Sequence, residues 1–196
     1  MWMTTRDELG QMLNRLGLLG VGVEVGVLKG HFSQRILDAW NGKTLLMVDP
    51  WEKQSDDVYT DVNNASDEAQ QGRMQQALQS VQYHEGRYQL IRGYSVEVAT
   101  QLPDGCLDFV YLDARHDYES VLEDLTAWYP KVRSGGLFAG HDFLDGQYAI
   151  EDDDGKEHLT SFGVGRAVRE FSAQVRQNFS VTTKDSPFES WYFIKH

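Results

Sequence analysis

Residues 21–30, with the sequence Val-Gly-Val-Glu-Val-Gly-Val-Leu-Lys-Gly, decide the fold of this chain. The first five residues are a short, mostly apolar run, which is typical of a strand buried on both faces of a parallel sheet. Gly26 and Gly30 follow this run, and residues 31–40 then show the spacing of apolar side chains that is typical of a helix. A buried strand that passes through glycines into a helix predicts an α/β protein with a ligand site at this turn.

The alternation of strands and helices continues along the rest of the chain. Further strands are predicted over residues 44–48, 88–91, 107–112, 137–140, 179–183 and 191–194. Helical patterns separate the first five strands, so these connections are crossovers between parallel neighbours. Only a loop separates the last two strands, which predicts an antiparallel pair.

We therefore predict a single α/β domain over residues 1–196 with a Rossmann-like fold. Its sheet has seven strands, is mostly parallel and ends in the antiparallel C-terminal strand pair, with helices on both faces. Residues 1–20 supply an N-terminal helix. Residues 144–162 form a long, acidic connection after the fifth strand, and long connections at the active end of such a sheet are usually functional or disordered. We expect this insertion to be a substrate lid.

The composition limits the partners of the protein. The 196 residues carry a formal net charge of −12, whereas proteins that hold nucleic acid usually display clusters of Lys and Arg. No apolar run approaches the roughly 20 residues that span a bilayer. Cys106, the only cysteine, rules out an internal disulfide, and no secretory signal is visible. These features predict a cytoplasmic protein with a small-molecule partner and with no nucleic acid or membrane to bind.

The turn after the first strand reads Glu24-x-Gly26-x-x-x-Gly30. Glycines let the backbone pass close to a ligand, and the free N–H groups at the start of the following helix suit a carboxylate or a phosphate. Ser33, in the first turn of that helix, either binds such a carboxylate or satisfies the helix end. The turn is not the dinucleotide motif G-x-G-x-x-G, because the third glycine of that motif would fall on Val25.

An acidic side chain follows the second predicted strand. Asp49 lies nineteen residues after Gly30, and an acid at this point can accept hydrogen bonds from both hydroxyls of a ribose. A surface acid without a ligand is the simpler alternative. The position directly after a buried strand favours the ligand role.

With these residues in place, the chain resembles the class I S-adenosylmethionine-dependent methyltransferases over nearly its whole length. The resemblance implies that the glycine loop faces the methionine part of the cofactor and that the acid after the second strand holds the ribose. The loop after the third strand would lie along the adenine. Together with Ser33, the residues expected to bind the cofactor are Glu24, Gly26, Gly30, Asp49, Gly93 and Ser95.

The residues that follow the fourth and fifth strands narrow the resemblance. The fourth strand is followed by Asp113 and His116, and the fifth by His141 and Asp142. These stretches look like the metal-dependent O-methyltransferases of the catechol and macrocin types. The resemblance implies that Asp113, His141 and Asp142 hold a divalent cation, usually Mg²⁺, and that His116 is the base.

His141 departs from these relatives, in which the corresponding residue is usually acidic. A neutral imidazole is a poor ligand for Mg²⁺ but a good one for Mn²⁺, Fe²⁺ or Zn²⁺. Either the cation is softer than Mg²⁺, or His141 contacts the acceptor, or no metal takes part. His116 also has an alternative role, as a cap of the helix that is predicted to begin near Tyr118.

The predicted reaction follows from the weak acidity of a hydroxyl group. An aliphatic hydroxyl is barely ionised at neutral pH, whereas a dication lowers its pKa and a neighbouring imidazole takes its proton. Asp113 and His116 are the expected catalytic residues of methyl transfer from S-adenosylmethionine to a hydroxyl oxygen of a small metabolite, assisted by Mg²⁺ or Mn²⁺. The alternatives are a metal-independent N- or O-methyltransferase and a nucleotide-binding oxidoreductase. A homodimer is an expectation from the resemblance alone.

Overall fold

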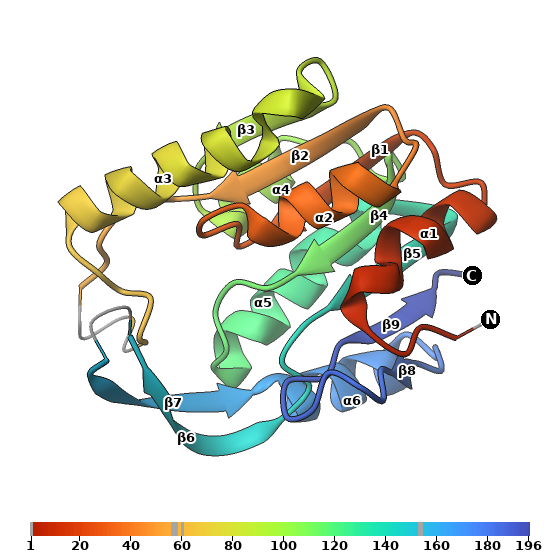
Figure 1. Ribbon diagram of the computed structural model, residues 1–196. Helices are drawn as coiled ribbons and strands as arrows, with labels where there is room; N and C mark the ends of the chain where they lie inside the picture. The colour runs from red at the N-terminus through yellow and green to blue at the C-terminus, as the bar shows by residue number, and fades with distance from the viewer. Residues whose placement is uncertain (1, 56–58, 60, 153–154) are drawn as a thin grey trace.

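A seven-stranded sheet forms the centre of the computed structural model, which describes residues 2–55, 59, 61–152 and 155–196 (Figure 1). The strand order is β3-β2-β1-β4-β5-β9-β8. The strands are β1 (Val21–Val25), β2 (Thr44–Asp49), β3 (Tyr88–Arg92), β4 (Leu107–Leu112), β5 (Val132–Gly140), β8 (Ser180–Val181) and β9 (Trp191–Ile194). Strands β1 to β5 pair in parallel, whereas β9 runs antiparallel to both β5 and β8. The predicted Rossmann-like sheet with an antiparallel C-terminal pair is confirmed.

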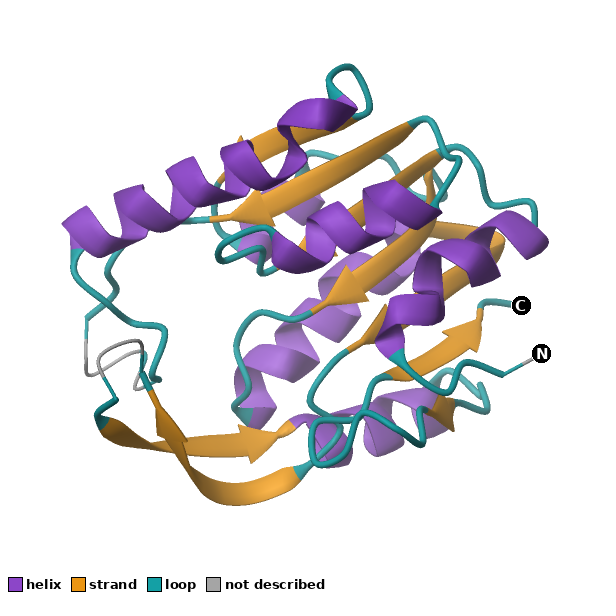
Figure 2. Cartoon of the chain, viewed as in Figure 1, coloured by secondary structure: helices purple, strands orange, loops and turns teal. Residues whose placement is uncertain are grey.

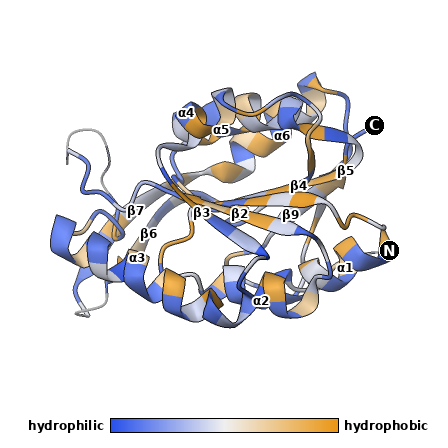
Figure 3. Ribbon diagram, turned by 90° about the horizontal axis from the view of Figure 1, so that it is seen from above, coloured by the Kyte–Doolittle hydropathy of each residue, from blue (hydrophilic) through white to orange (hydrophobic). Residues whose placement is uncertain are grey.

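Helices cover both faces of this sheet (Figures 2 and 3). One face carries α1 (Leu9–Arg15), α2 (His31–Ala39) and α3 (Asp67–Val81), and the other carries α4 (Ser95–Thr100), α5 (Tyr118–Trp128) and α6 (Val164–Gln174). Three short 3₁₀ turns complete the described helical segments, at Arg6–Glu8, Gln82–His84 and Tyr129–Lys131.

Alternate side chains of the central strands enter two separate cores. All six residues of β4 are buried. Phe109 and Tyr111 pack with the helices on one face, and Val110 and Leu112 pack with those on the other. Full burial of such a side chain contributes about 1.5–3 kcal/mol. The two cores hold β4 rigidly beside β1, so the carboxyl ends of these two strands lie next to each other.

Strand β5 begins earlier than the apolar pattern predicts. Its expected start was residue 137, because the glycines at positions 135 and 136 look like a break between elements, but the strand begins at Val132. The pairing with β4 shifts register between Leu107 and Phe109, and Gly135 has a φ of 76°. Glycines in a strand often mark such an irregularity rather than an end.

Helix α3 also begins before its expected apolar residues. Apolar side chains at helical spacing occur only over residues 74–81, whereas α3 starts at Asp67 and is capped by Ser66, whose hydroxyl accepts a hydrogen bond from the N–H of Ala69. The first turns of α3 carry mostly polar side chains, so apolar spacing does not reveal them.

The insertion over residues 144–162 forms a hairpin of two antiparallel strands, β6 (Asp145–Glu151) and β7 (Glu157–Gly163). This hairpin is a separate two-stranded sheet. In Figure 1 it lies on the side of the molecule to which the arrowheads of β2 and β4 point.

The N-terminal segment is attached to the C-terminal part of the chain. The backbone N–H of Met3 donates to the Tyr192 hydroxyl over 2.7 Å, and that of Arg6 donates to Asp185 over the same distance. These contacts place the side chain of Arg6 near the carboxyl end of the sheet. Within the described part of the chain, no helix has both the length and the apolar character needed to cross a membrane.

Candidate cofactor and acceptor site

The glycine loop after β1 lies against the end of β4. Gly26 has a φ of 87°, and a Cβ atom there would lie 1.9 Å from the carbonyl oxygen of Asp113. Gly30 has a φ of 75°, and a Cβ there would lie 2.5 Å from Oγ of Ser80. Both positions therefore require glycine, but for different reasons. Gly26 lets the loop approach the Asp113 backbone, whereas Gly30 lets α2 pack against α3.

Asp49 fixes the shape of this loop. Its carboxylate accepts hydrogen bonds from the backbone N–H groups of Val27 and Leu28, each over 3.0 Å, and of Trp51 over 2.8 Å. Burial raises the pKa of Asp49, although these N–H donors oppose the shift. A carboxylate has about four acceptor positions. Three are engaged, so Asp49 keeps limited capacity for a ribose.

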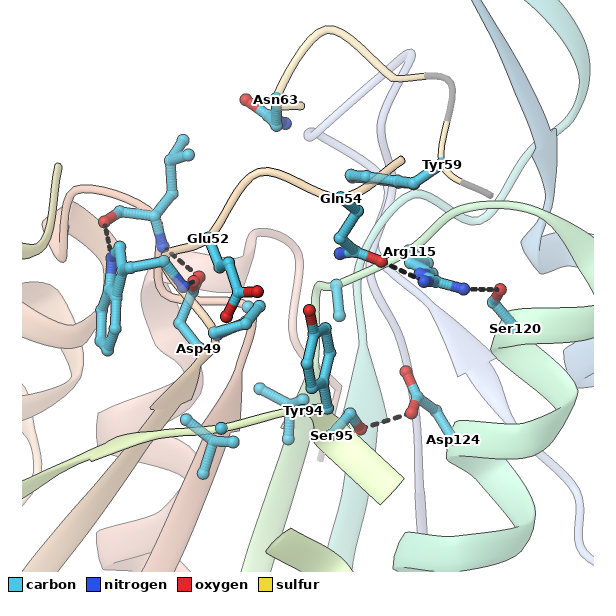
Figure 4. A pocket seen from close by; sticks show the side chains of 18 of the residues that line it. Asp49, Glu52, Gln54, Tyr59, Asn63, Tyr94, Ser95, Arg115, Ser120 and Asp124 are labelled. Carbon is cyan, nitrogen blue, oxygen red and sulfur yellow. Dashed lines mark hydrogen bonds between the residues drawn. The ribbon is translucent and has the colours of Figure 1, made fainter. Parts of the chain in front are cut away.

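A cavity of about 230 Å³ opens beside Asp49, at the carboxyl ends of β1, β2 and β4 (Figure 4). Four of the residues expected to bind the cofactor line it: Gly26, Asp49, Gly93 and Ser95. We name this space the cofactor cavity.

One buried acid in the cofactor cavity was not anticipated from the sequence. Asp124, on α5, accepts a hydrogen bond from the Ser95 hydroxyl, which itself accepts one from the indole N–H of Trp128 over 2.8 Å. Burial raises the pKa of Asp124 to about 7. No sequence signal marked this acid, because it lies in the middle of an amphipathic helix.

Arg115 contacts three other residues that line the cofactor cavity. Its guanidinium donates to the Ser120 hydroxyl over 3.2 Å and to the side-chain oxygen of Gln54. It also lies 5.4 Å from the ring centroid of Tyr59 (Figure 4). The contacts connect the segment after β2 with the segment after β4.

The other expected cofactor residues, Glu24, Gly30 and Ser33, do not line the cofactor cavity. Glu24 is buried and accepts a hydrogen bond from the Ser33 hydroxyl. Burial raises the pKa of Glu24 to about 8, although this hydrogen bond opposes the shift. Ser33 is fully buried and belongs to neither of the two main cavities. The structure thus places Ser33 behind Glu24.

A second cavity, of about 340 Å³, adjoins the first. Gly26, Leu28, Asn63 and Asp113 line both spaces. The hairpin contributes Ile150, Thr160 and Phe162 to its wall. We name this second space the acceptor cavity.

The polar residues expected after β4 and β5 meet at the base of the acceptor cavity. Nε2 of His116 lies 3.0 Å from an oxygen of Asp142, and Nδ1 of His141 lies 2.9 Å from the other oxygen. Burial disfavours a charge on Asp142, but the hydrogen bonds from the two histidines outweigh it and hold its pKa well below the usual range. Asp142 therefore stays ionised beside both rings.

His116 is held on its other side by Asp61, which lies 3.0 Å from Nδ1. Burial opposes a charge on the ring, but the hydrogen bonds to Asp142 and Asp61 outweigh it and raise the pKa of His116 to about 10. The ring does not cap α5, because Asp117 occupies that position and accepts from the N–H of Ser120 over 2.9 Å. The alternative role considered for His116 is thus filled by its neighbour.

Asp113, His141 and Asp142 could together hold a cation. Each offers one ligand atom, and these atoms lie within 4.8 Å of one another. Arg6, which the sequence did not single out, reaches the same place and donates to Asp113 over 3.2 Å. Two carboxylates and one imidazole suit a borderline divalent cation such as Mn²⁺ or Zn²⁺ better than Mg²⁺.

Comparison with known families agrees with this arrangement. A family model described as methyltransferase domain matches residues 23–143, which include the glycine loop, the lining of the cofactor cavity and the polar cluster after β4 and β5. No curated protein sequence matches the chain.

Solved structures of low sequence identity share the fold. An O-methyltransferase from Bacillus cereus in complex with SAH has a TM-score of 0.63 and 14% identity, over 97% of this chain and 80% of that one. TomG, an O-methyltransferase of tomaymycin synthesis from Streptomyces achromogenes in complex with SAM, has a TM-score of 0.60 and 15% identity, over 97% and 80%. A 1,6-didemethyltoxoflavin-N1-methyltransferase from Burkholderia thailandensis has a TM-score of 0.57 and 12% identity, over 97% of this chain and 76% of that one. At such identities the likeness shows the fold alone.

The chain belongs to the methyltransferase-domain family, since the match covers more than half of its length. It is an S-adenosylmethionine-dependent methyltransferase with a Rossmann-like fold. The alternative of a nucleotide-binding oxidoreductase is thereby set aside.

Proposed function

We propose that this enzyme transfers the methyl group of S-adenosylmethionine to a hydroxyl oxygen of a small acceptor, with the assistance of a divalent cation. The observation that carries the proposal is that Asp113 lines both cavities. A cofactor in the first cavity would meet an acceptor in the second beside Asp113, His116, His141 and Asp142.

The cofactor cavity supports the placement of S-adenosylmethionine. Gly26 and Asp49 would lie along its methionine and ribose parts, and Gly93 and Ser95 along its adenine. Gly30 and Ser33 would shape the loop from behind, and Glu24 would face the cofactor from the wall of the acceptor cavity, which it lines. The structural neighbours from Bacillus cereus and Streptomyces achromogenes hold the same cofactor or its demethylated product.

His116 is the residue placed to move the hydroxyl proton. In the described arrangement its Nε2 is bonded to Asp142 and the ring is protonated. The ring would act as a base only after its Nε2 proton has passed to solvent, and Nε2 would then take the hydroxyl proton of the acceptor. Asp113, as one of the residues that would hold the cation, would fix the position of the acceptor oxygen relative to the methyl carbon, which supplies proximity and orientation.

The donor set of Asp113, His141 and Asp142 fits a divalent cation. Such a cation would lower the pKa of the acceptor hydroxyl. The bond from Arg6 to Asp113 favours a second candidate, a metal-independent methyltransferase, because the guanidinium already compensates part of the negative charge.

A screen of hydroxylated acceptors with radiolabelled S-adenosylmethionine tests the proposal. We expect methyl transfer to phenols or sugar-bearing metabolites that Mn²⁺ enhances and EDTA abolishes. Activity that survives EDTA unchanged would select the metal-independent candidate. Transfer only to amines would contradict the hydroxyl acceptor.

Several finer expectations from the sequence belong to the same proposal. The hairpin over residues 144–162 would act as the substrate lid, since three of its side chains line the acceptor cavity. A cytoplasmic location, a homodimer and the lack of a nucleic-acid or membrane partner stay predictions.

A further inference from the structure

The imidazole of His116 is fixed by contacts from three separate segments. A carboxylate oxygen of Asp61 lies 3.0 Å from Nδ1, and one of Asp142 lies 3.0 Å from Nε2. The ring of Phe162, from the hairpin, packs on the imidazole with 4.9 Å between centroids and 30° between planes. The His116 carbonyl accepts a hydrogen bond from the N–H of Gly163 over 2.8 Å.

We propose that Asp61 is a positioning residue, which fixes the tautomer and the orientation of His116 for methyl transfer. This inference rests on the proposed function, in which His116 takes the proton of the acceptor hydroxyl. Asp61 comes from the segment before α3, far from the motifs after β4 and β5.

The carboxylate of Asp61 is itself held firmly. Its side chain is only 2% exposed. One oxygen accepts the backbone N–H of Asn63 over 2.8 Å and the other lies 3.0 Å from Nδ1 of His116, while the Tyr59 side chain also forms a hydrogen bond with this carboxylate. The carboxylate cannot rotate without breaking the bond to Asn63, so the direction of its second oxygen is set by the backbone.

The chemistry of this pair determines which ring nitrogen reacts. An ionised carboxylate only accepts hydrogen bonds, so Nδ1 must carry a proton toward Asp61. Nε2 also carries a proton while it faces the ionised Asp142, and once this proton has passed to solvent Nε2 is the nitrogen that accepts on the side of the acceptor cavity. In the reaction the acceptor oxygen forms a bond to the methyl carbon and the bond from that carbon to sulfur breaks. The hydroxyl proton passes to Nε2, and Asp61 stabilises the resulting imidazolium.

The Asp61→Asn variant tests this role with little change of shape. The N–H of Asn63 requires an oxygen in the substituted amide, so the amide NH₂ group would face Nδ1 of His116. A donor at that position forces the proton onto Nε2, which is the wrong tautomer for a base. We expect kcat to fall about 10²-fold or more, while the Kd of S-adenosylmethionine changes less than about two-fold.

Asp67→Asn is the matched control. Asp67 begins α3 on the same segment, is exposed, and accepts a hydrogen bond from the N–H of Lys53 outside both cavities. The same loss of one charge should leave kcat within about two-fold of the parent. A comparable fall in both variants would attribute the effect to charge and overturn the proposal.

A double-mutant cycle tests whether Asp61 acts on kcat through His116 or independently of it. In a His116→Ala background, Asp61→Asn should have no further effect on kcat, because the residue that Asp61 positions is gone. Additive losses would overturn the proposal. So would a kcat of Asp61→Asn close to that of the parent.

Asp61→Ser provides a second variant in case Asp61→Asn does not fold. The serine hydroxyl is too short to bridge to both Asn63 and His116, so we expect the same selective loss of kcat. Loss of cofactor binding in both variants, with a lowered Tm, would assign Asp61 to the structure alone and overturn the inference. A parent enzyme that methylates no hydroxyl acceptor would instead refute the proposed function.

Discussion

The buried acid Asp124 makes the stability of this enzyme depend on pH in a direction that can be calculated. Burial raises its pKa from 3.8 to about 7. Because the folded pKa lies above the unfolded one, the folded state retains a proton that the unfolded state releases. The stabilising contribution is therefore complete below about pH 4 and is lost as the pH rises through about 7.

The size of this effect follows from the shift. Each unit of pKa corresponds to about 1.4 kcal/mol, so the full shift of about three units corresponds to about 4 kcal/mol. Between pH 5 and pH 8 the parent should lose about 2–3 kcal/mol of this contribution. For a chain of this size that loss corresponds to a fall in Tm of roughly 5–10 °C.

Asp124→Asn removes the titration and keeps an acceptor for the Ser95 hydroxyl. Urea unfolding gives the free energy of unfolding of parent and variant at pH 5 and pH 8. The difference between variant and parent should shift by about 2–3 kcal/mol in favour of the variant from pH 5 to pH 8. Glu119→Gln, which removes an exposed acid elsewhere on α5, is the control and should show no such gain. If the free energies of unfolding of Asp124→Asn and the parent differ by the same amount at pH 5 and at pH 8, the reasoning is refuted.

Two further substitutions test how the glycine loop is built. Gly26→Ala places a Cβ 1.9 Å from the Asp113 carbonyl oxygen at a φ of 87°, so it should lower the free energy of unfolding by at least about 2 kcal/mol and weaken S-adenosylmethionine binding. Gly72→Ala on α3 is the control, because a Cβ there meets nothing within 4 Å, and it should be neutral or stabilising by up to about 1 kcal/mol. Equal losses of stability in both glycine variants would contradict the argument. Asp49→Ala leaves three backbone N–H groups without their acceptor and should cost about 2–3 kcal/mol of stability as well as cofactor affinity. A variant with the Tm of the parent but weakened binding in calorimetry would show that Asp49 serves the ribose alone.

The strands at the centre of the sheet could be predicted because burial on both faces leaves a continuous apolar run. β1 and β4 have the predicted bounds for this reason. The start of β5 could not be predicted, since Gly135 and Gly136 look like a stop although they lie within the strand. The first turns of α3 were missed because their polar surface carries no apolar period.

The same distinction holds for the site. The convergence of Asp113 and Asp142 could be predicted, because strands of a parallel sheet end at one edge and the residues directly after them lie close together. The positions of Arg6 and Asp61 could not, because they depend on contacts between distant segments. Arg6 reaches Asp113 only through the attachment of the N-terminal segment to Asp185. The spacing of residues within one segment contains no information about such contacts.

Calorimetric titration with S-adenosylmethionine and with NAD is the most direct test of the central claim, which is that the cofactor cavity at the carboxyl ends of β1, β2 and β4 holds a sulfonium nucleoside. We expect one molecule of S-adenosylmethionine to bind per chain and NAD to give no heat of binding. Saturable binding of NAD, or a flat titration with S-adenosylmethionine by the folded protein, would contradict the assignment of the cavity.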